Sequence, residues 1–162
     1  MLLEHGKKIK VDNKDKLILE QLQLNARLTI AEIAKITKLP RDVVMYRIKK
    51  METSKVIRGH HTMINPGKIG HPLYSYVFFS TYNLKVETEN AFIKYLTSQK
   101  HIVYVAKNSG QYDFTIGICA KDYREFDEII RSIRQKFINV IKDITVTPVI
   151  QEYKFDMMTD LI

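Results

Sequence analysis

The residues best suited to binding chemistry lie between positions 41 and 58, where basic, aromatic and short acidic side chains are interleaved. Lysine and arginine pair with phosphate oxygens, and short polar or aromatic side chains can reach the edges of bases. We therefore predict contact with double-stranded DNA, with three side chains near bases and three on phosphates. The first group is Arg41, Asp42 and Tyr46, and the second is Lys49, Lys50 and Arg58.

A helix with two different faces must position these side chains. At 100° per residue, Val44, Ile48 and Met51 form one apolar stripe. The opposite face carries Asp42, Met45, Tyr46, Lys49, Lys50 and Thr53. Such a helix fits the major groove of DNA, whereas the alternative is a solvated amphipathic helix pair with no ligand. Arg47 falls toward the apolar edge, and we predict an internal ion pair with Glu52 or Asp15.

The preceding residues predict a helix-turn-helix. Thr29 and Glu32 form a capping box, so a helix starts at residue 30. Pro40 disfavours a helical Leu39 and suits the first turn of the next helix. Asp12 caps an earlier helix, with an apolar stripe at positions 18, 19 and 22, which makes three helices in all.

The segment after the third helix predicts a small wing. Residues 56–64 alternate loosely around Gly59, which suggests two short strands. Lys55 stands where a glycine commonly closes a helix, and a left-handed backbone costs a non-glycine residue about 1 kcal/mol. We therefore expect this helix end to be slightly strained or built another way.

Net charge supports a polyanion partner for the first half only. The formal charge is +8; residues 1–65 hold 14 Lys and Arg against 7 Asp and Glu, and residues 66–162 hold 12 against 11. Phosphate neutralisation and counterion release supply most non-specific DNA affinity. An anionic membrane would attract the same charge, but no basic helix carries the large aromatic face needed for insertion.

Composition narrows the remaining classes. Cys119 is the only cysteine, so no internal disulfide framework is possible and a small core residue is expected. No apolar run approaches 18 residues and no signal-peptide order is present, so we expect a cytoplasmic protein. No paired carboxylates, Ser/His/Asp set or phosphate loop indicates an enzyme or a cofactor. His60 and His61 point to opposite faces of a strand and have no acidic or cysteine partner at ligand spacing, so no metal site is predicted.

The second half repeats a strand, helix, strand unit. Residues 65–72 are rich in turn formers and predict a hinge. Strands are predicted at 73–82, 101–107, 112–120 and 144–153, with helices at 88–99 and 123–139. This order is the ferredoxin-like split βαβ. Its helices cover one sheet face only. The other face carries either the row of Tyr74, Tyr76 and Phe78 or that of Val77 and Phe79, and both rows are too apolar to remain exposed to solvent. A homodimer would cover it.

A turn between the two units offers the groups that would bind a free amino acid. Gly110, Gln111, Tyr112 and Asp113 supply an open backbone, an amide, a stacking ring and a carboxylate. The alternative is a hairpin in which Gly110 makes the turn and Asp113 satisfies backbone amides.

Several motifs in this order resemble the Lrp/AsnC family of bacterial and archaeal transcription regulators. They are Val11–Leu19, Asn25–Thr29, the Val44, Arg47, Ile48, Met51 and Glu52 pattern, Val56–Gly59, and Gly110–Phe114. Pro40 and Lys55 depart from the frequent serine and glycine. The resemblance implies a winged helix-turn-helix joined by a hinge to a ferredoxin-like βαββαβ (RAM-type) domain, forming dimers and often octamers, with amino-acid effectors bound near the Gly-x-Tyr-Asp turn.

The expected division is a flexible arm at 1–10, a DNA-binding domain at 11–64, a hinge at 65–72 and an effector-sensing and oligomerisation domain at 73–162. The predicted function is sequence-specific DNA binding by a transcriptional regulator, modulated by a small effector such as an amino acid that biases oligomer assembly. The alternative is an architectural DNA-organising protein with no effector.

Overall fold

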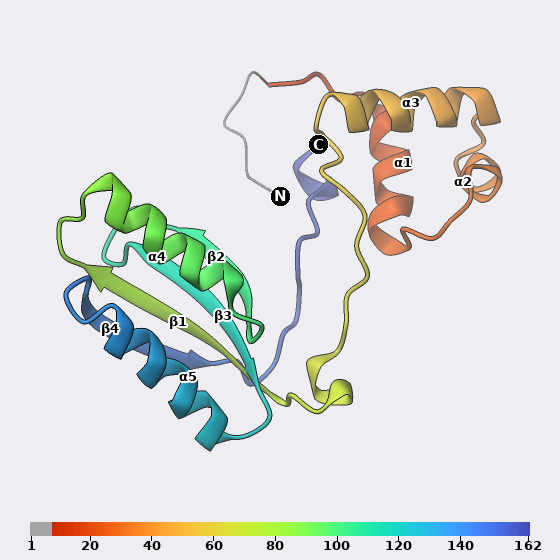
Figure 1. Ribbon diagram of the computed structural model, residues 1–162. Helices are drawn as coiled ribbons and strands as arrows, with labels where there is room; N and C mark the ends of the chain where they lie inside the picture. The colour runs from red at the N-terminus through yellow and green to blue at the C-terminus, as the bar shows by residue number, and fades with distance from the viewer. Residues whose placement is uncertain (1–7) are drawn as a thin grey trace. The chain divides into compact units, whose positions relative to one another are not determined.

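The computed structural model describes residues 8–162, which form two compact units (Figure 1). Unit 1 comprises the chain up to Met63 together with Tyr153–Ile162, and unit 2 is Ile64–Glu152. Positions 1–7 of the predicted arm lie outside the described residues. Among the described residues, no helix has both the length and the apolar character needed to span a membrane.

Three helices build unit 1: α1 (Asn13–Leu24), α2 (Ile30–Thr37) and α3 (Arg41–Thr53). Each contributes two buried apolar side chains to one core, which are Ile18, Leu19, Ile33, Ala34, Val44 and Met51. The predicted caps are confirmed, because Asp12 and Thr29 both form capping boxes, with Asp15 and Glu32. Pro40 directly precedes α3 as its N-cap residue and provides no side-chain hydrogen bond. The predicted helix-turn-helix is therefore present.

The end of α3 follows the expectation of a strained closure. Lys55 adopts a left-handed backbone with φ of 61°, and its N–H donates to the Glu52 carbonyl at 3.1 Å. Residues 56–64, however, form no strands, and the predicted two-stranded wing is not formed. Val56 and Ile57 instead pack against the three-helix core. A two-stranded hairpin alone is marginally stable in water, and most of this segment is exposed.

The last ten residues pack with unit 1, whereas the predicted second domain runs from 73 to 162. Gln23 of α1 holds this segment: its Nε2 donates to the Asp156 carbonyl at 2.6 Å, and its Oε1 accepts from the Met158 and Thr159 amides at 3.1 Å each. Lys16 Nζ donates to the Ile162 carbonyl oxygen at 2.6 Å. The short 3₁₀ helix η2 (Thr159–Leu161) thus lies against α1.

Unit 2 is a four-stranded antiparallel sheet with two helices, in the predicted ferredoxin-like order. Its elements are η1 (Pro66–Ile69), β1 (Leu73–Thr81), α4 (Val86–Ser98), β2 (Ile102–Lys107), β3 (Phe114–Ala120), α5 (Tyr123–Lys136) and β4 (Ile141–Pro148). The strand order is β2-β3-β1-β4. The last strand was predicted at 144–153, but β4 begins three residues earlier and ends five residues earlier. It pairs with β1 from Ile141 to Pro148, which lies opposite Ser75.

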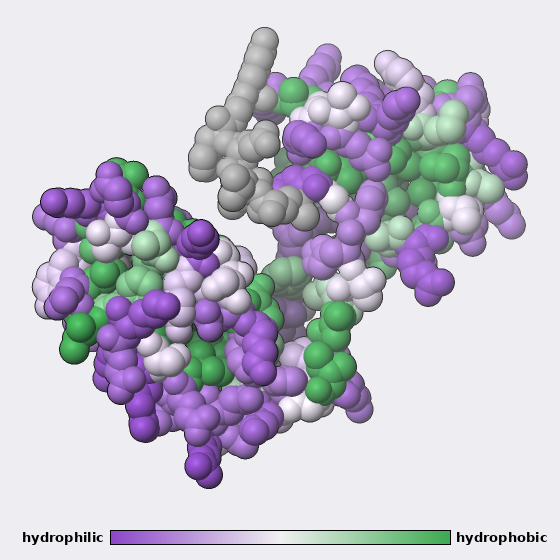
Figure 2. Space-filling model, viewed as in Figure 1, coloured by the Kyte–Doolittle hydropathy of each residue, from purple (hydrophilic) through white to green (hydrophobic). Residues whose placement is uncertain are grey.

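One face of this sheet packs on both helices. Val77, Phe79 and Ile116 of the sheet share a core cluster with Phe92 of α4 and Ile133 of α5. The outward surface of α5 is covered by hydrophilic side chains (Figure 2). This helix therefore has the ordinary division into an apolar inner and a solvated outer face.

The opposite sheet face carries aromatic side chains, of which Tyr104 is exposed and the others are half-buried. Tyr76 contacts Tyr74 and Tyr104, with ring centroids 5.3 and 6.1 Å apart, and Phe78 lies 5.2 Å from Tyr112. Cys119 is buried next to them in register, opposite Tyr74, as the core residue expected from its type. We name this set, Tyr74, Tyr76, Phe78, Tyr104 and Tyr112, the aromatic face.

Candidate nucleic-acid interface and effector turn

The outer side of α3 presents the predicted DNA-binding residues to solvent. Exposed on this helix are Arg41, Asp42, Tyr46, Lys49 and Lys50. Tyr46 is 66% exposed and the neighbouring Met45 is 59% exposed, which is far more than a side chain of this size retains in a core. Arg58 is also exposed, in the irregular segment after the helix. All six side chains are thus accessible to a ligand.

A shallow hollow on this surface adds one residue, Ser54, that the sequence did not single out. Tyr46, Lys49, Lys50, Thr53 and Ser54 line it. Thr53 was placed on the outer face by helical spacing, but Ser54 belongs to the closing turn, whose course depends on the left-handed Lys55. Helical periodicity stops at that point, so spacing could not assign Ser54.

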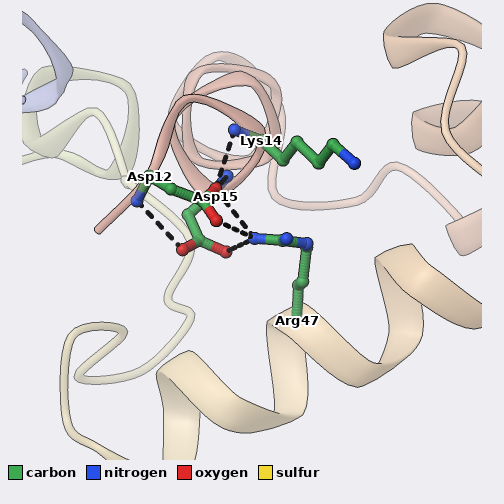
Figure 3. Close-up of polar contacts among 4 residues, drawn as sticks. All are labelled: Asp12, Lys14, Asp15 and Arg47. Carbon is green, nitrogen blue, oxygen red and sulfur yellow. Dashed lines mark hydrogen bonds and ion pairs between the residues drawn. The ribbon is translucent and has the colours of Figure 1, made fainter. Parts of the chain in front are cut away.

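Arg47 fixes the orientation of α3 against the start of α1 (Figure 3). Its Nη1 lies 2.7 Å from Asp15 Oδ1 and 2.8 Å from Asp12 Oδ1. Of the two predicted partners, Asp15 is confirmed and Glu52 is not, since Glu52 contacts His60 instead. The ion pair clamps the back of the recognition helix while its front stays open.

This ion pair changes the pKa values of Asp12 and Arg47. The hydrogen bond from Arg47, together with the Asp15 amide, lowers the pKa of Asp12 to about 2. The same two carboxylates raise the pKa of the Arg47 guanidinium. Both partners therefore stay ionised at neutral pH, and the positive charge of Arg47 is neutralised within the domain rather than offered to a ligand.

The predicted effector turn is built around Gly110, whose φ of 139° favours glycine. A Cβ placed there would meet no atom within 4 Å, so the backbone is open to approach. Tyr112 hydroxyl lies 3.2 Å from Thr145 Oγ1, and Ser80 Oγ donates to the Gln111 carbonyl at 3.0 Å. The turn is thus anchored to β1 and β4.

Asp113 already has structural partners. Its Oδ2 accepts from the Thr81 amide at 2.6 Å and from Thr81 Oγ1 at 2.9 Å, while its own N–H donates to the Phe79 carbonyl. The backbone amide that Asp113 satisfies belongs to Thr81 at the end of β1, and not to the turn itself as the hairpin alternative expects. The structure brings Gly110, Gln111, Tyr112 and Asp113 together in one turn, with Gln111 exposed and Tyr112 and Asp113 half-buried.

Comparison with known proteins decides the family. Residues 11–58 match the family model described as winged helix-turn-helix DNA-binding, and residues 77–159 match the Lrp/AsnC ligand binding domain. The chain belongs to the Lrp/AsnC family. Lrp/AsnC proteins are DNA-binding transcriptional regulators and not enzymes.

Named relatives and solved structures agree with this assignment. The HTH-type transcriptional regulator LrpA of Pyrococcus abyssi is 31% identical over 132 residues, which cover 82% of this chain and 92% of the relative. An AsnC family regulator from Agrobacterium tumefaciens is 24% identical with a TM-score of 0.80, over 91% of this chain and 95% of that one. A Neisseria meningitidis regulator solved as an L-Met complex is 19% identical with a TM-score of 0.82, over 94% and 100%. The last two show the Lrp/AsnC fold.

Proposed function

We propose that this chain is a sequence-specific DNA-binding transcriptional regulator whose homo-oligomer assembly is biased by a small effector, such as an amino acid. The outer face of α3 is the observation that carries the DNA part. It combines exposed lysines for phosphates with exposed Arg41, Asp42 and Tyr46 for bases. The Arg47 ion pair with Asp12 and Asp15 holds the helix from behind.

Salt dependence of DNA binding tests this surface. Replacing Lys49 and Lys50 together by alanine should weaken binding to every duplex and reduce the slope of log K against log salt by roughly 1.8 for each bound protomer. A matched control replaces Lys94 and Lys100, two exposed lysines of unit 2. An unchanged slope in the Lys49 and Lys50 variant would remove α3 from the interface.

We assign the effector to the Gly110–Asp113 turn. The open backbone at Gly110 and the exposed amide of Gln111 support this site. The turn also lies within the part of the chain that matches a ligand binding domain, and a structural neighbour was solved with L-Met. Sedimentation of the protein with each of the twenty amino acids is the first experiment, because a shift with one of them identifies the effector. No shift with any amino acid would favour an architectural DNA-organising protein instead.

The role of Asp113 needs a control for its structural bonds. Asp113→Ala should abolish the effector response and leave salt-dependent DNA binding intact. Thr81→Val removes one hydroxyl bond to Asp113 but keeps the carboxylate and the Thr81 backbone amide bond. An equal loss of response in Thr81→Val would show that Asp113 acts by shaping the turn rather than by touching the effector.

The aromatic face is our proposed dimer contact. Its five rings come from β1, β2 and the turn before β3, and none of them is fully buried in the single chain. Burial of aromatic rings supplies much of the free energy of subunit association. A symmetric pair of such faces would bring two effector turns into one assembly, which gives the effector a route to bias oligomerisation.

A further inference from the structure

Three potential metal ligands meet at one end of unit 2. His71 precedes β1, His101 lies between α4 and β2, and Glu125 is in the first turn of α5. One ligand atom from each lies within 4.8 Å of the others. All three residues are half-buried, so their side chains are more restricted than those of freely exposed residues. This cluster is separate from both the α3 surface and the Gly110–Asp113 turn.

Both histidines have their Nδ1 atoms directed at backbone carbonyls. His101 Nδ1 lies 3.3 Å from the Cys119 carbonyl oxygen, and His71 Nδ1 lies 3.2 Å from that of Ile69. A carbonyl oxygen can only accept a hydrogen bond, so these contacts favour the tautomer with the proton on Nδ1. The Nε2 atom of each ring then keeps its lone pair. Metal-binding histidines have this arrangement, in which the second nitrogen donates to the protein.

The third ligand, Glu125, has one of its two carboxylate oxygens engaged in a hydrogen bond within the protein. Glu125 Oε2 accepts from the Lys121 amide at 2.8 Å, and Oε1 lies 3.8 Å from His101 Nε2. A glutamate carboxylate is ordinarily ionised near neutral pH. An ionised oxygen and an imidazole lone pair are both electron donors. A cation between them turns this repulsion into attraction.

We propose that His71, His101 and Glu125 bind one divalent transition metal ion of the zinc type. Two imidazoles and one carboxylate are the ligand set that Zn²⁺ accepts at sites with three protein ligands, where a water completes the tetrahedron. With metal–ligand bonds of about 2.0–2.1 Å, tetrahedral ligand atoms stand roughly 3.4 Å apart. His101 Nε2 and Glu125 Oε1 are 3.8 Å apart, and all three ligand atoms lie within 4.8 Å of one another. Binding would therefore require the side chains to draw together by up to about 1.4 Å.

Bound metal would act on the segment that joins the two units. His71 is in the predicted hinge, two residues before β1. Coordination would tie this position to α5 and to the start of β2, both of which belong to unit 2. The site therefore adds a metal-dependent constraint on the hinge, and it goes beyond the proposed regulation by an amino acid.

Titration of the metal-free full-length protein with Zn²⁺ near neutral pH tests the site. We expect one ion per chain, and at least tenfold weaker binding in the His71→Ala/His101→Ala variant. Glu125→Gln should also weaken binding. Its amide oxygen can still accept from the Lys121 amide, so this variant should fold even if the double histidine variant does not. Circular dichroism checks that each variant is folded.

The matched control is His60→Ala/His61→Ala, which removes two exposed histidines of unit 1. It should bind Zn²⁺ as tightly as the parent. Zn²⁺ should also raise the unfolding temperature of the parent and of this control but not that of Glu125→Gln. Unchanged affinity in the folded ligand variants, an equal loss in the control, or no stoichiometric binding to the parent would each overturn the proposal. DNA binding is measured separately, so failure here leaves the proposed function standing.

Discussion

Arg47 and Asp15 form an ion pair between α3 and the start of α1, with Nη1 and Oδ1 2.7 Å apart. The Asp15 side chain is only 5% exposed and that of Arg47 19%. A carboxylate this buried depends on its partner, because an unpaired buried charge is strongly destabilising. The pair therefore adds a polar contact to the apolar packing of Val44 and Met51 that positions α3 and its outer face.

Replacing Arg47 by methionine keeps the aliphatic bulk and removes the charge. We expect the free energy of unfolding to fall by about 3 kcal/mol, because the Asp15 carboxylate then stays buried without its cation. Urea denaturation measures this change. Arg41→Met removes an arginine from the exposed start of the same helix and should cost less than about 0.5 kcal/mol. Equal effects in the two variants would contradict the assigned role of Arg47.

The stability of unit 1 should depend on acid pH through Asp12. Its folded pKa is about 2, below the ordinary value of 3.8, because Arg47 and the Asp15 amide stabilise the carboxylate. A lowered folded pKa means that the unfolded chain binds protons first. The contribution is therefore complete above about pH 5 and is lost progressively as pH falls through 4 toward 2.

Unfolding curves at a series of pH values would show this trend as a decline in midpoint between about pH 5 and 2. The decline should be shallower in Asp12→Asn, which no longer titrates at this position. Glu128→Gln removes an exposed carboxylate of unit 2 and serves as the control. A decline of the same steepness in Asp12→Asn and in the parent would locate the acid sensitivity elsewhere.

Tyr46 should influence which DNA sequence is preferred. Removing its ring by Tyr46→Ala leaves the lysines in place, so non-specific affinity should change little while discrimination between sites drops by about 1–3 kcal/mol. Selection from randomised duplexes followed by affinity measurements compares the two proteins. Tyr123→Ala removes a tyrosine of unit 2 that is 77% exposed, and it should select the same sequences as the parent. Identical preferences in all three proteins would place base recognition on other residues.

Gly117 controls the packing of the aromatic face. A Cβ at this position would lie 2.8 Å from the Tyr74 hydroxyl and 3.0 Å from Tyr104 Cβ. Gly117→Ala must therefore displace Tyr74, and we expect self-association to weaken at least tenfold. Sedimentation over a range of concentrations measures it, with Ser132→Ala on the exposed side of α5 as control. Unaltered association would argue against this face as the dimer contact.

Local signals were sufficient for most of the fold. Capping boxes at Asp12 and Thr29 act over three residues, so both helix starts were predictable. The alternation of Val77 and Phe79 with their aromatic neighbours likewise follows from strand geometry. The prediction of a two-stranded wing was wrong because its strands had only each other to pair with. Their apolar residues Val56 and Ile57 pack against the three-helix core instead.

Contacts between distant segments were beyond the reach of spacing. The sequence could limit the ion-pair partner of Arg47 to Glu52 or Asp15 only because the helix face of Arg47 restricts which carboxylates it can reach. His71 and His101 come from two separate connections and Glu125 from the first turn of α5, and their meeting depends on the register that sets Leu73 opposite Ala120. The three residues are not spaced along the chain like a metal-binding motif, so the sequence pointed only to the adjacent His60 and His61 as candidate metal ligands.

The bonds from Gln23 to the last turn of the chain have a consequence for biosynthesis. Gln23 and Thr159 are 136 positions apart, so at about 5–20 residues per second the ribosome needs roughly 7–27 s to make the second after the first. Throughout that interval the DNA-binding unit must exist without its final segment. During that time the three-helix core lacks the bonds that Gln23 makes with the last turn.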